Sequence, residues 1–410
     1  VAGVGAGDGG RLEISAPNGT AALDGAISGG AGPTAADLPV DTQPVSGSFD
    51  LDVATLTDFS ALNTKLNAGG FTESRHLRIR SGDIVIDAGD TARERDVVRA
   101  RDVRFVADNG AINVKGKIDA SGVRGGSVEL WAAKAVALRN GGEIDAAAKG
   151  TNERGGSVLL ATAGADNATL RLETGSKIDV SGTQTAESGE VYLRAPRVDT
   201  DNDGVADSVG VAELNATITG AGRVDVEAFS VKTLAAGEDI ADINGFDTFI
   251  PTGERDRLTA QLIGANPGLG QQVFHMLPGV EIRTPDSATA LNISGTLDLK
   301  DPRAADGEPG VLTIRSAGDL NVNGSISDGF SDPTTNGILF ADGDSWSYRF
   351  VAGADLGSAH ASALNRNGMG DFRLAADKLI RTGTGFIDVA AAGDIVLTNQ
   401  KSVIYTAGHN

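Results

Sequence analysis

One short stretch of the chain has the residue types of a metal site. Carboxylates alternate with other residues at Asp199, Asp201 and Asp203, and a glycine follows directly. Calcium takes about six to eight oxygen ligands, and alternate carboxylates before a glycine turn can bring several oxygens to one centre. Val205 would add its carbonyl oxygen, and Asp207 would bind directly or through water. The sequence therefore predicts a calcium site made by Asp199, Asp201, Asp203, Val205 and Asp207.

This loop departs from the helix-loop-helix calcium site at its last ligand position. The twelfth residue is Gly210, where that site has a bidentate glutamate. The loop is more similar to the shorter calcium-binding repeats of thrombospondin type. A solvated acidic turn without a metal is the alternative interpretation.

A second polar cluster contains five arginines interleaved with acidic residues. Guanidinium groups recognise oxyanions, so the cluster could bind a sulfated glycan. Its neighbours Glu94, Asp96 and Asp102 favour the alternative, a salt-bridged outer face of strands. The arginines are Arg93, Arg95, Arg99, Arg101 and Arg104.

Nothing in the sequence indicates an active site. The four histidines lie at neither metal-ligand nor triad spacing, and the chain has no cysteine. β-Helical polysaccharide lyases and hydrolases do place carboxylates in a groove, and Asp119, Asp145 and Asp179 recur at equivalent positions. A turn residue recurs in every coil whereas a catalytic residue occurs once, so the pattern favours a chain that is not an enzyme.

The elements that must position these residues are repeats with a period of about 30 residues, which is typical of a solenoid. One phrase centres on Ile-Asp, and a second begins as Gly-Gly-Ser-Val in its first two copies. The first phrase occupies residues 116–122, 142–146 and 176–182, and the second occupies 125–130, 155–160 and 188–193.

Apolar residues alternate in the second phrase, which indicates strands with one inward face. Three strands per repeat, in one copy Val128–Ala132, Ala135–Arg139 and Glu143–Ala146, predict the coil of a right-handed parallel β-helix. Coils stack at about 4.8 Å, so Val128, Val158 and Val191 should form an internal ladder. The paired glycines should leave room for neighbouring coils and allow positive φ.

Two aromatic residues, Trp131 and Tyr192, fall on outward strand positions of this pattern. They could stack on sugars. Packing under a loop or against a neighbouring chain is the favoured alternative.

The rest of the chain divides into blocks around this pattern. We expect a β-helix block over 1–235, with a loop and helix excursion at about 31–75. Within it, Asp58 can cap a helix over Asp58–Asn67. An irregular, helical excursion over 236–285 should contain a helix at Glu254–Ile263, and a second β-helix block should cover 286–410.

Composition narrows the class of protein further. Among 410 residues, 56 are glycine and only 4% are aromatic, which suits a thin core of stacked aliphatic side chains. A net charge of −20 argues against nucleic-acid binding. No apolar run reaches the roughly 20 residues of a membrane helix. Because the start resembles mid-repeat, we expect a mature or excised segment of a longer chain.

The repeated phrases resemble those of the filamentous haemagglutinin family, the large exoproteins of Gram-negative two-partner secretion. The resemblance covers the chain from about residue 55 onward, and no amino-terminal secretion domain of that family is recognisable. It implies a long right-handed β-helical rod, exported through an outer-membrane transporter and used in adhesion, surface structure or cell contact. Further motifs that carry it lie at Leu277–Ile282, Gly307–Thr313, Ser345–Arg349, Arg381–Gly385 and Ser402–Gly408.

These observations together predict a structural shaft segment of a secreted, cell-surface exoprotein of a Gram-negative bacterium. Its expected partners are the outer-membrane transporter, further copies of itself in fibres, and a glycan or cell-surface receptor; no nucleic acid and no transmembrane segment are expected. A carbohydrate-binding adhesive module is the first alternative, and a polysaccharide-degrading enzyme on the same scaffold is the second.

Overall fold

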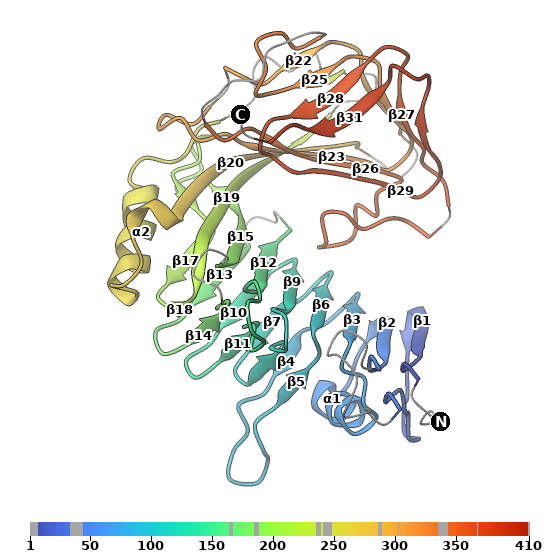
Figure 1. The fold of residues 1–410 in the computed structure, drawn as a ribbon, viewed down its shortest axis with the longest axis vertical. Coiled ribbons are helices and arrows are strands. Elements are labelled where there is room, and N and C mark those ends of the chain that lie inside the picture. The colour runs from blue at the N-terminus through green and yellow to red at the C-terminus, as the bar shows by residue number, and fades with distance from the viewer. Residues whose placement is uncertain are drawn as a thin grey trace. The chain divides into compact units, whose positions relative to one another are not determined.

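Parallel β-strands make up most of the regular structure (Figure 1). The structure, a computed structural model, describes residues 7–32, 44–163, 167–183, 188–234, 239–240, 248–285, 289–301, 303–334, 343–366 and 368–408. His409 lies outside these residues. The predicted all-β, parallel β-helical fold class with short helical excursions is confirmed.

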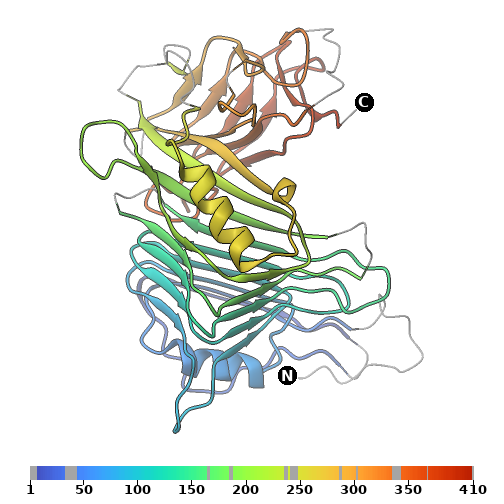
Figure 2. The same ribbon diagram turned by 90° about the vertical axis from the view of Figure 1, so that its left-hand side faces the viewer.

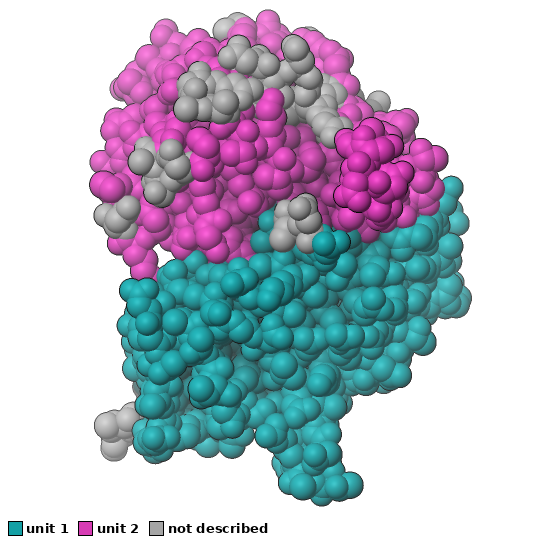
Figure 3. Space-filling view, turned by 180° about the vertical axis from the view of Figure 1, so that it is seen from behind, with its two compact units in different colours: residues 1–195, 210–225, 256–275 teal, residues 196–209, 226–255, 276–410 magenta. Residues whose placement is uncertain are grey.

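The chain divides into two compact units, which Figure 3 shows in different colours. The units interleave along the sequence, so their boundaries do not coincide with the predicted blocks. Strands β15 (Gly189–Val198), β19 (Ala221–Thr233) and β20 (Phe274–Arg283) contain residues of both. The first unit is Val1–Ala195, Gly210–Asp225 and Asp256–His275; the second is Pro196–Val209, Val226–Arg255 and Met276–Asn410.

In the first unit, each coil from β3 onward contributes one strand to each of three sheets, β1 and β2 extend the first sheet alone, and the strands lie one above the next (Figure 2). The first sheet contains, in order, β1 (Arg11–Thr20), β2 (Ser48–Thr55), β3 (Ser74–Ile79), β6 (Asp102–Ala107), β9 (Ser127–Ala132), β12 (Ser157–Thr162) and β15. The second contains β4 (Ile84–Ile86), β7 (Ala111–Val114), β10 (Ala135–Leu138), β13 (Thr169–Leu172) and β17 (Val211–Leu214). The third contains β5 (Val97–Arg99), β8 (Lys117–Asp119), β11 (Glu143–Asp145), β14 (Lys177–Asp179) and β18 (Thr217–Thr219).

The predicted ladder runs through the core of this unit. Val158 is in register with Val128 on one side and with Val191 on the other. All three side chains are at most 1% exposed. Leucines two residues further along each strand form a second ladder on the same inward face. Stacking therefore buries the apolar face that a single coil would expose.

The repeated glycines are needed for space. A Cβ on Gly156 would lie 2.2 Å from the Ala146 carbonyl oxygen and 2.5 Å from that of Gly126. A Cβ on Gly126 would meet the Ala120 carbonyl oxygen at 2.1 Å. The expected positive φ is wrong for these glycines, because the left-handed glycines of the chain lie at other positions. The close approach of neighbouring coils excludes a side chain there.

Helices cover both ends of the second and third sheets in this unit. At the start of these two sheets, α1 (Phe59–Ala68) packs against β4 and β5, and Asp58 caps it as predicted by accepting from the Ala61 N–H at 2.9 Å. At the last coil, side chains of α2 (Glu254–Ala265) and of the residue after it accept hydrogen bonds from backbone N–H groups of the edge strands. Gln261 accepts from the Leu214 N–H at 3.0 Å, and Asn266 from the Ile218 N–H at 2.7 Å. Covering an edge in this way prevents further strand pairing.

The predicted excursion at 31–75 is partly wrong, because it contains strand β2. Phe49, Leu51 and Val53 alternate along β2 and are at most 3% exposed. The region 236–285 contains α2, a short 3₁₀ helix at Gln271–Val273 and strand β20.

The second unit repeats the three-sheet coil with larger core side chains. Trp346, Tyr348, Phe350 and Phe372 are fully buried in it. Its first sheet contains β20, β23 (Val311–Ser316), β26 (Ser347–Ala352) and β29 (Ile387–Ala391). Its second contains β21 (Leu291–Ile293), β24 (Leu320–Val322), β27 (Phe372–Leu374) and β30 (Ile395–Leu397), and its third β22 (Leu297–Asp298), β25 (Ile326–Ser327), β28 (Leu379–Thr382) and β31 (Val403–Thr406).

Candidate functional site

The predicted calcium loop is the tip of a hairpin in the second unit. The end of β15 pairs antiparallel with β16 (Ser208–Val209), with Val198 opposite Ser208. The chain between them turns sharply at Asn202 and Gly204, which have φ values of 60° and 92°. Asparagine and glycine tolerate this left-handed conformation better than other residues.

Three of the five predicted ligands come together at this tip. Carboxylate oxygens of Asp199, Asp201 and Asp203 all lie within 4.8 Å of one another. Backbone N–H groups already stabilise them, since Asp199 accepts from Gly204 at 2.7 Å and from Asp203 at 3.2 Å. The Gly204 hydrogen bond is the largest cause of a lowered pKa at Asp199. The donor set suits a hard cation, because oxygens of three carboxylates lie close together.

The other two predicted ligands are placed differently. Asp207 accepts from the N–H of Thr200 at 3.0 Å and from its hydroxyl at 2.5 Å, so its carboxylate closes the base of the hairpin. Val205 is exposed, and its N–H donates to Asp203 at 2.8 Å. The carboxylate cluster thus contains Asp199, Asp201 and Asp203 without Asp207.

The arginine cluster is largely a salt-bridged face, the alternative that its acidic neighbours favoured. Arg101 pairs with Glu73, and Arg104 pairs with Glu129 at 2.8 Å. Arg93 pairs with Asp87 at 2.9 Å. Arg95 donates to two backbone carbonyl oxygens and lies 3.7 Å from Glu143. Arg99 differs from the other four, since it forms no ion pair with any described residue.

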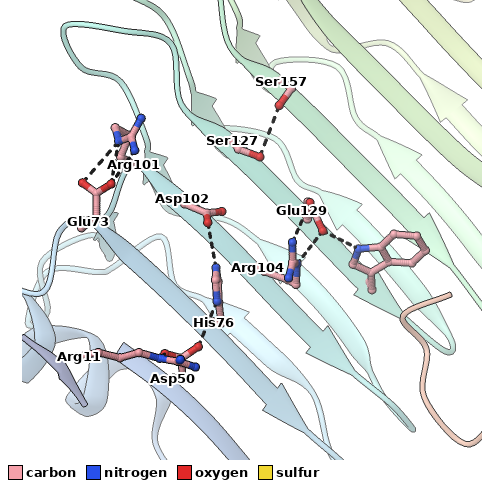
Figure 4. A network of polar contacts seen from close by, with 11 residues as sticks. Arg11, Asp50, Glu73, His76, Arg101, Asp102, Arg104, Ser127, Glu129 and Ser157 are labelled. Atoms are coloured by element: carbon pink, nitrogen blue, oxygen red, sulfur yellow. Dashed lines mark hydrogen bonds and ion pairs between the residues drawn. The ribbon is translucent and has the colours of Figure 1, made fainter. Parts of the chain in front are cut away.

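A chain of polar contacts crosses the outer face of the first sheet (Figure 4). His76 on β3 lies between two carboxylates, with Nδ1 3.1 Å from Asp50 on β2 and Nε2 3.0 Å from Asp102 on β6. Arg11 on β1 donates to the same Asp50 at 2.7 Å. The hydrogen bond to Asp102 is the largest cause of a raised pKa at His76. Both imidazole nitrogens can donate only when the ring is protonated.

Aromatic stacking on sugars is not available to Trp131. Its side chain is only 3% exposed, and its indole N–H donates to Glu129 at 3.3 Å. Tyr192 is half-buried on a neighbouring strand. The burial of Trp131 agrees with the favoured alternative, a packed side chain.

The recurring aspartates have a shared role in turns. Asp119, Asp145 and Asp179 stack in register along the third sheet, as the sequence predicts. Each accepts a hydrogen bond from the N–H two residues further on, at distances of 3.3, 3.2 and 2.9 Å. This contact is an Asx turn, so the recurrence follows from the geometry of the corner.

An open groove of about 450 Å³ crosses the starts of β6, β9, β12 and β15. Its lining includes the Ser127 and Ser157 hydroxyls, 3.4 Å apart, and the charged side chains of Arg101, Arg154 and Glu190. The groove runs across the strands and therefore along the direction in which coils repeat.

Comparisons of the chain with protein-family models, with curated proteins and with solved structures find no match. The resemblance to the filamentous haemagglutinin family therefore stays a prediction from the motifs. Among the described residues, no helix is both long and apolar enough to cross a lipid bilayer.

Proposed function

We propose that the chain is a structural shaft segment of a secreted β-helical exoprotein on the outer surface of a Gram-negative bacterium. The supporting observation is the register of consecutive coils. Strands β6, β9, β12 and β15 pair in sequence without a shift, and each of these four strands places apolar residues at the same inward positions. Such a stack transmits load through continuous strand pairing and needs no cofactor.

Protease treatment of intact cells tests the surface location. Protease added outside should degrade the chain while a cytoplasmic marker protein survives. Export through an outer-membrane transporter of two-partner secretion belongs to the same proposal and is supported by the motif resemblance. Inactivating that transporter should leave the chain protected. A chain that is protected in unmodified cells would contradict the proposal.

Self-association into fibres is part of this proposal and involves the second unit. Its last coil exposes apolar residues at inward positions, with Ile395 and Leu397 exposed by 52% and 42%. The strand that carries them, β30, is an edge strand of its sheet. Electron microscopy should show ordered filaments, and Leu397→Lys should prevent them because a buried lysine opposes edge pairing.

A carbohydrate-binding adhesive module is the second candidate, and the groove across β6, β9, β12 and β15 favours it. A row of hydroxyl and charged groups along the repeat direction suits a linear polymer with many hydroxyl groups. Glycan-array binding that is lost in Ser157→Trp would favour this candidate. Degradation of an acidic polysaccharide by the chain would instead favour an enzyme.

We also propose that calcium binds the hairpin tip through Asp199, Asp201 and Asp203. Bound calcium would neutralise three carboxylates that otherwise repel one another, and so would stabilise the turn. The remaining ligands would be carbonyl oxygens or water.

A further inference from the structure

A buried cation without a carboxylate partner lies beneath α1 in the first unit. Arg75 is 1% exposed. It donates to three neutral oxygens, each at 2.8 Å: the Phe71 carbonyl and the side-chain oxygens of Asn63 and Asn67. Within the described part of the chain, no carboxylate forms an ion pair with it. Burial first, and the nearby Arg99 second, lower the pKa of Arg75 to about 10.

Arg99 is the second member of this like-charged pair. It ends β5, is exposed, and also lacks an ion pair among the described residues. Neighbouring like charges disfavour each other's charged forms unless an anion lies close by. The pair is therefore a place where a bound anion would be strongly favoured, although the chain as a whole carries a net charge of −20.

An open cavity of about 540 Å³ lies beside these residues, between α1 and residues 93–99. Arg99 lines it directly, and Asn63 and Asn67 separate it from Arg75. Both carboxamides also donate to the Val97 carbonyl, at 3.1 and 2.8 Å, which fixes this wall. The hydroxyls of Ser60 and Thr64 add polar groups to the lining.

Three acidic residues also line the cavity, and two of them have other partners. Asp58 accepts from the Ala61 N–H at the start of α1. Asp96 is 7% exposed and accepts from the Ser60 hydroxyl at 2.6 Å and from the Asp87 N–H at 2.9 Å. Glu94 is exposed at the rim. Arg93 and Arg95 line the cavity as well, but Arg93 pairs with Asp87 at 2.9 Å and Arg95 donates to two backbone carbonyl oxygens at 2.8 Å. Arg99 is therefore the lining arginine that forms no ion pair with a described residue.

We propose that this cavity binds an oxyanion of the sulfate class, free or as the sulfate ester of a sugar, with Arg99 as its principal ligand. The guanidinium fork matches two oxygens of such a group. The buried Arg75 adds a positive field from behind the asparagine wall without touching the ligand. The site is separate from the groove on the first sheet and does not depend on the proposed shaft function.

Titration calorimetry with sodium sulfate, and separately with a heparin-derived tetrasaccharide, tests the proposal at constant ionic strength. The unmodified chain should bind at least one of them saturably. Arg99→Gln should weaken binding by about tenfold or more, because a charge-assisted pair is lost. Arg373→Gln is the matched control: it removes the same charge from an exposed arginine of β27, outside both the cavity and the groove. Glu94→Gln should strengthen binding.

The two titrations also distinguish the source of the anion. Binding of inorganic sulfate indicates a free anion, whereas binding of the tetrasaccharide alone indicates a sulfate ester on a sugar. A tetrasaccharide without sulfate should not bind in either case. Equal affinities for Arg99→Gln and Arg373→Gln, or no saturable binding of either probe, would overturn the proposal. Circular dichroism checks that each variant keeps its strands.

Discussion

At the scale of single residues, His76 links three strands through its proton. Asp50 approaches it from β2, and Asp102 and Arg104 approach it from β6. Arg11 on β1 donates to Asp50. Because its pKa is raised in the folded state, protonated His76 stabilises the fold. That contribution is fully present below the unfolded pKa of 6.5 and is lost as pH rises through the folded pKa.

We therefore expect His76→Gln to lower the melting temperature at about pH 6 and to change it much less at about pH 9. Thermal unfolding followed by circular dichroism measures this difference. Arg104 lowers the pKa of His76, so Arg104→Gln should move the loss of stability to higher pH. A melting-temperature difference that does not vary with pH would contradict this role for His76.

The hairpin tip gives a second prediction at this scale. Calcium should raise the melting temperature, and Asp203→Asn should weaken calcium binding on the order of tenfold by removing one charged ligand. Asp207→Asn is the control, because Asp207 pairs with Thr200 and should affect calcium binding far less. A melting temperature that is the same in calcium and in chelator would exclude the site.

At the scale of elements, the sequence pattern located strands well where apolar residues alternate. The predicted strands at Val128–Ala132, Ala135–Arg139 and Glu143–Ala146 match β9, β10 and β11 to within a residue at each end. The helices at Asp58–Asn67 and Glu254–Ile263 match α1 and α2 to within two residues. The bounds of these strands and helices follow from local apolar periodicity and helix capping, so they can be predicted without knowing how neighbouring coils pack.

Contacts between coils could not be found in the same way. His76 lies 26 residues from Asp50 and 26 residues from Asp102, one coil away on each side. Motif spacing within one segment does not detect such a cluster, although aligning the coils by register would have suggested it. The pairing of Asp207 with Thr200 and the burial of Trp131 likewise depend on how the folded chain packs.

The helices at the ends of the first unit give a prediction about edges. Asn266, 6% exposed, accepts from the Ile218 N–H and donates to the Ala216 carbonyl at 2.9 Å. Asn266→Ala would leave both groups unsatisfied beside the edge strand β18, and should cost about 3 kcal/mol of unfolding free energy. Urea denaturation measures the loss. Gly264→Ala, on the exposed side of α2, should instead be neutral or slightly stabilising.

The same edge makes Asn266→Ala informative about association. An uncovered β18 presents free backbone groups to other chains, so the variant should form larger species in analytical ultracentrifugation. Loss of stability without association would mean that α2 contributes packing alone.

At the scale of a whole compact unit, the structure is built by repeating one element, the coil. Ser157 occupies the position of Ser127 one coil later, 30 residues along the chain. Deleting residues 127–156 would join Gly126 to Ser157 and stack β12 directly on β6. Val103 would then meet Val158, and Phe105 would meet Leu160; all four are at most 1% exposed now. Because stability in such stacks is a sum of nearest-neighbour terms, the shortened chain should fold.

A deletion of half a coil provides the control for this prediction. Removing residues 127–141 deletes β9 and β10, so that β11 follows β8 directly in the chain. A strand of the third sheet would then come where the chain needs a strand of the first sheet. The inward-facing residues of the neighbouring coils would lose their partners. Circular dichroism and cooperative urea unfolding should therefore be retained after the 127–156 deletion and lost from the first unit after the 127–141 deletion. Equal disruption by the two deletions would mean that particular interlocking contacts, rather than repetition of equivalent coils, hold the unit together.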